Sequence, residues 1–365
     1  MALMHLNNSI DKNILFNNIV GLDLGYGYVK VSSGETNIKF LSIVGNPISD
    51  FAKTSAISSF EELLNTLTII YQGKTYYIGH NAQLNTRNGK ISLRQNKYDN
   101  DEQTKIKIMT ALALLTDENQ YEAEFDIICG LPVLEYRNQR DQLKAILNNN
   151  DQPFEFIMKY GNKSVHKSIK CNKIKVVSQG EAVIYDYILS NDGNIISSRS
   201  NNISGIVMVT DMGYKTCDIV TMENGRYIET YCDQLNNGVV QIQQEVLRLI
   251  MQEYGIKKEL KDIDEIIRNK QLFYSTKTYN ISHLIKQASE PFAENIIEAL
   301  YTINNGELGN ISRVLLAGGG AELIFDYMKN KLINVVQVEK IYNSEFANSN
   351  GYYKYGVLLR NNNSF

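Results

Sequence analysis

The sequence lacks the cysteine and histidine patterns that mark metal sites and disulfide frameworks. Its four cysteines form no CxxC pair and are far apart in the chain, at Cys129, Cys171, Cys217 and Cys232. Three of them lie in apolar, strand-like segments, which favours buried, reduced thiols over metal ligands or disulfides. The four histidines are equally scattered, and we assign no metal to any of them.

The sequence also lacks long apolar runs and a strong excess of charge. No segment approaches the roughly 20 apolar residues that are needed to cross a bilayer. Residues 1–18 contain no basic segment followed by an apolar core, so they do not form a secretory signal. The net charge of −3 and the pI of 5.9 argue against a surface built mainly for nucleic acid. We therefore expect a cytoplasmic protein with no membrane contact and no direct binding of DNA.

Two common nucleotide-binding motifs are absent as well. No GxxxxGK[ST] phosphate loop occurs anywhere in the chain. The segment Gly25-Tyr26-Gly27 lacks the third glycine of a GxGxxG motif, and the pattern after it predicts a strand rather than a helix. If the protein binds a nucleotide, it must do so in another way.

What the sequence does contain is an acid beside a glycine turn. An apolar run ends at Asp23, and Gly25-Tyr26-Gly27 separates it from a second alternating run, which predicts strand, turn and strand. Glycines allow backbone N–H groups to approach a phosphate, and an aspartate beside them can hold a divalent cation through water. An ordinary turn with a solvated aspartate would give the same pattern.

The same arrangement occurs a second time, which strengthens the phosphate interpretation. Another apolar run ends in Asp211-Met212-Gly213-Tyr214, again with the pattern Asp-x-Gly-Tyr. A third glycine turn, Gly318-Gly319-Gly320, joins a predicted strand to a predicted helix. Three successive positions without side chains let a ring or a sugar lie against the backbone. A complex of Mg²⁺ and a polyphosphate is the ligand that suits both the donors and the two acids.

Each half of the chain follows the same order of predicted elements. A chain of 365 residues is long enough for two domains. In each half a meander of strands carries the acid and the glycines, and strands alternating with helices follow. Hairpins are predicted at Gln72-Gly73-Lys74 and at Asn224-Gly225, with residues 226–232 pairing back, and Pro291 predicts a kink or a break in a helix. The pattern predicts two α/β or α+β halves that face one another around a ligand crevice.

The order of these motifs resembles the superfamily of actin, DnaK-type chaperones and sugar kinases. Within it, the chain resembles the bacterial actin-like ParM (StbA) plasmid-partitioning proteins over about residues 19–359. Three stretches carry the closer match: Gly130-Leu131-Pro132, Gly318 to Ile324, and Asn343-Ser344-Glu345-Phe346 continuing through Asn350-Gly351-Tyr352 to Gly356. The resemblance implies an α/β, actin-like fold in which two duplicated RNase H-like domains flank a nucleotide cleft.

The resemblance also implies a division of the chain and roles for individual residues. Residues 1–18 would be a flexible leader, 19–178 the first domain, 179–342 the second, and 343–360 a helix that returns to the first. Asp23 and Asp211 would hold Mg²⁺ through water, with Lys30 as the charge partner of the phosphates and Asp218 as a supporting acid. The residues lining the nucleotide would be Asp23, Gly25, Tyr26, Gly27, Lys30, Gly213, Tyr214, Lys215, Thr216, Asn237, Gly238, Gly318, Gly319, Gly320 and Glu322.

Hydrolysis requires a group that orients water in line with the γ-phosphate. The related proteins place a Gln or Glu at the head of the first connecting helix, where this chain reads Ser178-Gln179-Gly180-Glu181. Gln179 aligns best and Glu181 is the alternative, with a first-turn acid favoured by the helix dipole as the other explanation of Glu181. Asp211 completes the catalytic set that the resemblance implies.

The resemblance implies an ATPase, with GTP as a possible substitute for ATP, whose nucleotide state controls a filament that segregates plasmid DNA. Its partners would be further copies of itself and an adaptor protein bound to a centromere-like DNA site. A cell-shape filament of the MreB type and a small-molecule kinase on the same fold are alternatives, as is a scaffold that does not hydrolyse nucleotide. No convincing general base for a kinase is present, and a chaperone would need a peptide-binding domain beyond Phe365.

Overall fold

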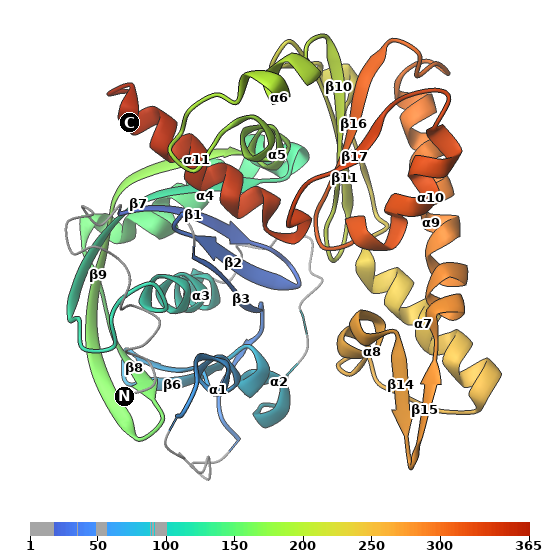
Figure 1. The fold of residues 1–365 in the computed structure, drawn as a ribbon. Coiled ribbons are helices and arrows are strands. Elements are labelled where there is room, and N and C mark those ends of the chain that lie inside the picture. Colours follow the sequence, from blue (N-terminus) through green and yellow to red (C-terminus); the bar gives the residue numbers. More distant parts are fainter. Residues whose placement is uncertain (1–17, 35, 49–56, 88, 90, 92–100) are drawn as a thin grey trace. The chain divides into compact units, whose positions relative to one another are not determined.

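The computed structural model describes residues 18–34, 36–48, 57–87, 89, 91 and 101–365 (Figure 1). The chain divides into two compact units. The first consists of Met1–Asn194 with Asn348–Phe365, and the second of Ile195–Ala347. Residues 1–17 of the expected leader lie outside the described residues.

The first unit is built on one curled sheet. Among the described residues the sheet has nine strands in the order β3-β2-β1-β7-β9-β8-β5-β6-β4. The strands are β1 (Ile19–Leu24), β2 (Tyr28–Ser32), β3 (Asn37–Leu41), β4 (Val44–Gly45), β5 (Thr68–Tyr71), β6 (Lys74–Ile78), β7 (Glu122–Leu131), β8 (Phe154–Tyr160) and β9 (Lys163–Ser178). The strand β1 is buried along its whole length, which accounts for its almost continuous apolar sequence.

Helices cover this sheet. They are α1 (Phe60–Asn65), α2 (His80–Asn85), α3 (Asp101–Ala113), α4 (Val133–Asn148), α5 (Gln179–Ile188) and α11 (Ala347–Asn361), with a 3₁₀ turn at Asn149–Asp151. The helix α3 lies inside the curl and contacts strands as distant in the sheet as β2 and β8 (Figure 1). Its residues from Ile108 to Ala113 are all buried, so it forms the centre of the hydrophobic core.

The second unit has a smaller sheet with helices packed against it. Within the described residues the strand order is β12-β11-β10-β16-β17, and β13 also pairs with β11. The strands are β10 (Ile206–Met212), β11 (Cys217–Glu223), β12 (Arg226–Tyr227), β13 (Asp233–Leu235), β16 (Ile311–Ala317) and β17 (Val338–Lys340).

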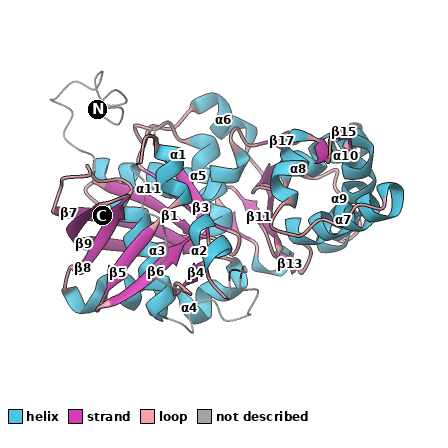
Figure 2. Ribbon diagram, turned by 90° about the horizontal axis from the view of Figure 1, so that it is seen from below, coloured by secondary structure: helices cyan, strands magenta, loops and turns pink. Residues whose placement is uncertain are grey.

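The helices of this unit are α6 (Ser197–Asn202), α7 (Val239–Tyr254), α8 (Ile263–Asn269), α9 (Ser282–Ile303) and α10 (Ala321–Leu332). The helix α9 packs against both α7 and α10 (Figure 2). A separate hairpin consists of β14 (Gln271–Tyr274) and β15 (Lys277–Asn280), and 3₁₀ turns lie at Glu229–Tyr231 and Ser344–Phe346. None of the helices in the described ranges combines the length and the apolar character that a membrane span requires.

The two sheets share one plan of strand pairing. In the first unit β3, β2 and β1 pair antiparallel, and β7 and β9 then continue parallel to β1. In the second unit β12, β11 and β10 pair antiparallel, and β16 and β17 continue parallel to β10. The expectation of two halves that repeat one fold is therefore confirmed.

Several local expectations can be compared with the structure. Both predicted hairpins form, between β5 and β6 and between β11 and β12. The prediction that residues 226–232 pair back as one strand is wrong beyond Tyr227, because a 3₁₀ turn intervenes before β13 resumes the pairing. The helix α9 runs through Pro291 without a break. The first unit extends to Asn194 rather than to residue 178, because α5 packs on its strands β7 and β9.

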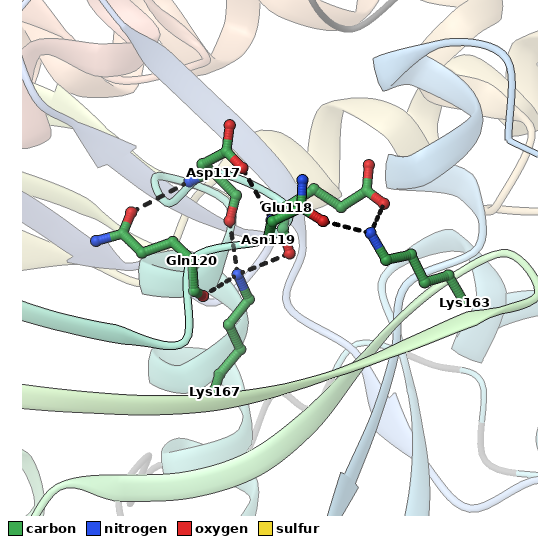
Figure 3. Close-up of polar contacts among 6 residues, drawn as sticks. All are labelled: Asp117, Glu118, Asn119, Gln120, Lys163 and Lys167. Atoms are coloured by element: carbon green, nitrogen blue, oxygen red, sulfur yellow. Dashed lines mark hydrogen bonds and ion pairs between the residues drawn. The ribbon is translucent and has the colours of Figure 1, made fainter. Parts of the chain in front are cut away.

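A buried lysine organises one loop of the first unit. The ammonium group of Lys167 on β9 donates to the backbone carbonyls of Asp117 and Gln120, each at 2.7 Å (Figure 3). It also donates to the hydroxyl of Thr116 at 3.1 Å. Burial lowers the pKa of Lys167 to about 8. The neighbouring Lys163 binds the carboxylate of Glu118 at 2.8 Å, so two lysines of β9 hold the loop between α3 and β7.

The helix α11 packs closely against β1 and α5 of the first unit because glycines lie at the contacts. A Cβ atom at Gly21 would overlap the carbonyl oxygen of Ser349, and one at Gly351 would overlap that of Ala182 on α5. These glycines allow the backbones of β1, α5 and α11 to approach closely. The contact between α5 and α11 is continued by a buried ion pair, in which Lys354 Nζ lies 2.8 Å from Asp186 Oδ1.

The substitution Gly351→Ala should separate α11 from α5 and destabilise the first unit by about 1–3 kcal/mol, the usual cost of overpacking. Urea unfolding followed by circular dichroism would measure this loss. Gly309→Ala is the matched control, because a Cβ atom there has no neighbour within 4 Å. Equal unfolding midpoints for the two variants would contradict the close packing at Gly351.

Candidate nucleotide site

In the first unit, two segments with predicted site residues and one stretch that carries the resemblance meet at one edge of the sheet. The strands β1, β7 and β9 are parallel, and Leu22 is level with Cys129, which is in turn level with Val176. The carboxyl ends of these strands therefore coincide, and the Asp23 turn, the Gly130-Leu131-Pro132 turn and Gln179 all lie there. Ligands of α/β proteins bind at such edges.

Asp23 is buried, and only one of its two carboxylate oxygens has a partner among the described residues. Its side chain is 3% exposed and faces Lys30 across the β1–β2 pair, with Lys30 Nζ at 3.3 Å from Asp23 Oδ2. The other oxygen, Oδ1, is buried and has no hydrogen-bond partner among the described residues. A buried carboxylate oxygen without a partner is costly, and a hydrated cation would satisfy it.

The turn after Asp23 depends on Gly25. A Cβ atom at this position would lie 2.5 Å from the carbonyl oxygen of Tyr28. The side chain of Tyr26 turns toward α4, where its hydroxyl is 3.4 Å from Glu135 Oε1. The predicted charge partner of the phosphates, Lys30, is in the structure the ion-pair partner of Asp23.

At the head of α5 the structure distinguishes between Gln179 and Glu181. Glu181 forms a capping box with Ser178, whose backbone N–H donates to Glu181 Oε2 at 3.3 Å. Burial raises the pKa of Glu181. Gln179 is half-buried, and its amide has no hydrogen bond within the part of the chain that is described. Glu181 is thus engaged in holding the helix end, whereas the amide of Gln179 is available to a ligand.

In the second unit, the corresponding aspartate lies opposite another acid. Asp211 on β10 is level with Asp218 on β11, and both are 5% exposed. Asp218 accepts a hydrogen bond from the amide of Gln234 at 2.7 Å. Burial, with the two carboxylates adding to the effect, raises the pKa of the Cys217 thiol on β11, so this cysteine is not a nucleophile. The pair concentrates negative charge at the carboxyl edge of the second sheet.

The second glycine turn is joined to the start of α7. The backbone N–H groups of Val239 and Val240 donate to the carbonyls of Gly213 and Tyr214, each at 3.0 Å. Gly238 must be glycine because a Cβ atom would overlap the backbone of Tyr214 and Lys215. The predicted residues from Gly213 to Thr216 and the segment Asn237-Gly238 therefore form one continuous surface. Burial raises the pKa of Tyr214 to about 12, with Asp264 adding to the effect.

The three glycines after β16 have different roles. Gly318 has a φ of +83°, and a Cβ atom there would overlap Met212 O and Asp211 Oδ1. Gly320 donates to the carbonyl of Met212 at 3.0 Å and packs against its side chain. Gly319 is exposed and has no atom within 4 Å of a Cβ position. Gly318 and Gly320 thus allow the turn to pack against the end of β10. Gly319 leaves its backbone accessible to a ligand.

Glu322 lies in the first turn of α10, next to these glycines, and pairs with Lys340 at the end of β17. Its side chain is mostly exposed. Two surface grooves of the second unit, of about 490 and 670 Å³, lie between α9 and α10 and along the end of α10 and β17. Neither groove is lined by a predicted site residue, so we do not assign them to the nucleotide.

Some supporting residues could not be foreseen from the sequence. Gln234 reaches Asp218 only because β13 pairs with β11, and Ser344 accepts from the N–H of Gly318 at 2.9 Å from a segment that follows β17. Gln234 lies in no motif, and the stretch Asn343-Ser344-Glu345-Phe346, which carries part of the resemblance, does not by itself predict the contact of Ser344 with Gly318. The general rule that loops gather at the carboxyl edge of parallel strands is the one signal that pointed to the second of these contacts.

Comparison with known proteins shows which families have a similar sequence and fold. Residues 21–181 match the family model "Actin like proteins N terminal domain", and residues 209–330 match "Archaeal actin homologue MreB-like, C-terminal". No curated protein matches the sequence. The protein has the actin-like fold, as the sequence predicted.

Within that fold, solved structures of ParM proteins are among the similar ones. A 15-stranded ParM filament from Clostridium botulinum has a TM-score of 0.72 and 22% identity, over 93% of this chain and 98% of that chain. The actin-like protein Alp7A has a TM-score of 0.76 and 12% identity, over 94% and 97%. The archaeal actin homologue Ta0583 in complex with ADP has a TM-score of 0.70 and 18% identity, over 93% and 98%. The predicted resemblance to ParM-type actin homologues is confirmed.

The substitutions Gly318→Ala and Gly319→Ala should differ in their effect on stability. Gly318→Ala forces a left-handed φ and an overlap with Met212 and Asp211, which should cost about 1–3 kcal/mol or more. Gly319→Ala enters open space and should change the free energy of unfolding by less than about 0.5 kcal/mol. Thermal melts of the two variants without nucleotide would measure the difference. A larger loss for Gly319→Ala would contradict the roles assigned here.

Proposed function

We propose that this protein is an actin-like ATPase that assembles into filaments when it binds a nucleoside triphosphate with Mg²⁺, and that these filaments segregate plasmid DNA. The observation that carries the proposal is the duplicated acid-and-glycine turn at the carboxyl edge of each sheet, on a fold shared with ParM filaments. Acids and open backbone in these places suit a polyphosphate with its cation.

The second unit supplies the surface for the nucleoside. Gly319 leaves its backbone open, and the turn from Gly213 to Thr216 would border the nucleotide beside it. The complex of Ta0583 with ADP supports a nucleotide as the ligand of this fold. Asn237 and Gly238 are joined to that turn through α7 and would border the ribose. Lys215 and Glu322 belong to the same edge and would contribute at its rim.

The aspartates would hold the cation. The free oxygen of Asp23 and the acidic pair of Asp211 and Asp218 are oxygen donors of the type that Mg²⁺ accepts through its water shell. Bound in this way, Mg²⁺ would neutralise charge on the phosphates. Lys30, already paired with Asp23, fixes the carboxylate and keeps a positive charge beside the first glycine turn.

Gln179 would orient the attacking water. Its amide can both accept and donate hydrogen bonds, and it stands at the first position of α5, at the same edge as Asp23. Glu181 instead keeps the helix end in place through the capping box. Because phosphoryl transfer depends on positioning and charge stabilisation, the loss of Gln179 should affect the rate more than the binding.

The pair Gln179→Ala and Glu181→Gln tests this assignment. Gln179→Ala should lower the rate of phosphate release roughly a hundredfold while leaving the nucleotide Kd almost unchanged. Glu181→Gln keeps an acceptor for the Ser178 N–H, so its rate should stay within a few-fold of the wild type. Single-turnover phosphate release and calorimetric titration would measure both quantities. The reverse pattern would transfer the water-positioning role to Glu181.

Self-association and segregation rest on the likeness to filament-forming relatives. The ParM filament from Clostridium botulinum and this chain share their fold over 93% of the residues here. Polymers that respond to hydrolysis can push or pull a cargo, and an adaptor protein on a centromere-like DNA site would link the cargo to the filament. The weakly acidic charge of this chain supports an adaptor rather than direct contact with DNA.

The decisive experiment is sedimentation of the purified protein with and without nucleotide. ATP with Mg²⁺ should bring the protein into the pellet, and phosphate release should then return it to the supernatant. Electron microscopy of the same samples should show filaments. GTP, ADP and EDTA serve as controls for the base, the γ-phosphate and the cation. A protein that hydrolyses ATP but never pellets would instead support a kinase-like or other monomeric activity.

A second candidate is a cell-shape filament of the MreB type, which the family match of residues 209–330 favours. Such a filament would polymerise in the same way but bind membrane instead of an adaptor. Co-sedimentation of nucleotide-bound polymer with anionic vesicles would distinguish the two. Polymer that remains unbound to vesicles supports plasmid segregation.

A further inference from the structure

The second sheet ends in a strand whose outer edge is unpaired. The strand β17 is the last in the order of this sheet and pairs with β16 alone among the described residues. Just after β17, the N–H of Ile341 donates to the carbonyl of Leu316 on β16 at 3.0 Å. Because successive residues of a strand direct their backbone groups to opposite edges, the N–H and C=O groups of Val338 and Lys340 point away from β16. Such an edge is a template for one more strand.

The larger of the two surface grooves, of about 670 Å³, lies along this strand, and we call it the β17 groove. One wall is a stripe of α10 that consists of Phe325, Lys329 and Ile333, four residues apart and therefore on one face of the helix. The other wall is formed by residues 334–340, which include β17. Ile333 is 67% exposed and Val335 is 42% exposed, so apolar side chains line the groove without filling it.

The edge of β17 lacks the features that usually protect an edge strand. Proteins commonly shield such edges with proline, a bulge or free charges. Residues 334–340 contain no proline, and the pairing of β17 with β16 runs over three residue pairs without a bulge. The two charged side chains of the strand are both paired within the unit, Glu339 with Arg313 and Lys340 with Glu322. The strand therefore presents no uncompensated charge of its own.

The opposite wall of the groove does carry an uncompensated charge, and it is positive. Lys329 is exposed, and its Nζ lies 5.4 Å from the centroid of the Phe325 ring. Lys340 Nζ lies 5.3 Å from the same centroid, where Glu322 balances its charge. Lys329 has no ion-pair partner in the part of the chain that the structure describes. A carboxylate of a ligand can therefore pair with Lys329, which favours an acidic ligand over a basic one.

We propose that the β17 groove binds an extended segment of a partner protein in which apolar and acidic residues alternate. The backbone of this segment pairs with Val338 and Lys340 as an added strand. Its apolar side chains cover Ile333 and Val335, and a carboxylate pairs with Lys329. Backbone pairing supplies affinity in this mode of recognition, and the alternating side chains supply specificity. The site is separate from the glycine turns, so the proposal goes beyond the proposed function and needs no nucleotide.

Fluorescence anisotropy with labelled model peptides tests the proposal on the whole chain without nucleotide. The probe is Thr-Val-Glu-Val-Glu-Val-Thr, which should bind the wild type. The same peptide with lysine in place of both glutamates should bind at least about tenfold more weakly, because it repels Lys329. Proline in place of the central valine removes a backbone donor and should weaken binding by a similar factor if the peptide adds as a strand.

The variant Lys329→Glu should reverse the preference, with a loss of about tenfold for the glutamate peptide and a gain for the lysine peptide. Lys286→Glu is the matched control, because it makes the same charge change at an exposed lysine in the other groove of the unit. Its affinities should equal those of the wild type. A wild type that binds neither peptide, or that binds the proline peptide equally well, would overturn the proposal. Loss of pelleting with ATP in Lys329→Glu, without peptide binding by the wild type, would instead make the groove a contact between copies.

Discussion

The parallel pairing of three strands in each sheet is the constraint on which the candidate site depends. In the first unit it brings the end of β1 level with the ends of β7 and β9, and in the second it does the same for β10, β16 and β17. Segments far apart in sequence, such as Asp23 and Gln179, then share one edge without any direct bond between them. A slip of one residue would turn every side chain of a strand to the opposite face, so the buried apolar pattern of the strands also fixes the position of the site.

Glycines let the loops at this edge of the second sheet pack closely against one another. Because Gly318 and Gly320 have no side chains, the third turn packs closely against Met212. Gly238 allows the start of α7 to pack against Tyr214 in the same way. These glycines therefore have a packing role, and they bring the turn after β10, the turn after β16 and the start of α7 into contact. Gly319 is different because a Cβ atom there would have no neighbour within 4 Å. In the sequence Gly318-Gly319-Gly320, the outer two glycines are needed for packing and the middle one has open space around it. The sequence alone does not reveal this difference.

The sequence predicted the strands, the hairpins and the repeated turn because these depend on local rules. Alternation, glycine turns and Asn224-Gly225 act within a few residues, and their outcome is visible in the chain itself. Contacts made by pairing over long distances were not predictable. The link of Gln234 to Asp218 requires β13 to return to β11, and the pairing of Lys30 with Asp23 depends on a cross-strand register. The helix α9 also continues through Pro291 without a break, because packing against α7 and α10 overrides a local preference.

Under the proposed function, the buried acids would link the stability of the protein to its ligand. Burying a carboxylate is unfavourable unless its oxygens are satisfied. Asp218 has the amide of Gln234 and Asp23 has the ammonium of Lys30, but Asp23 Oδ1 remains without a partner among the described residues. If the proposed hydrated cation binds at Asp23, it would offset this cost, because a ligand that binds only the folded state stabilises that state by mass action. Under the proposed function, the protein would then be less stable with the site empty than with the cation bound.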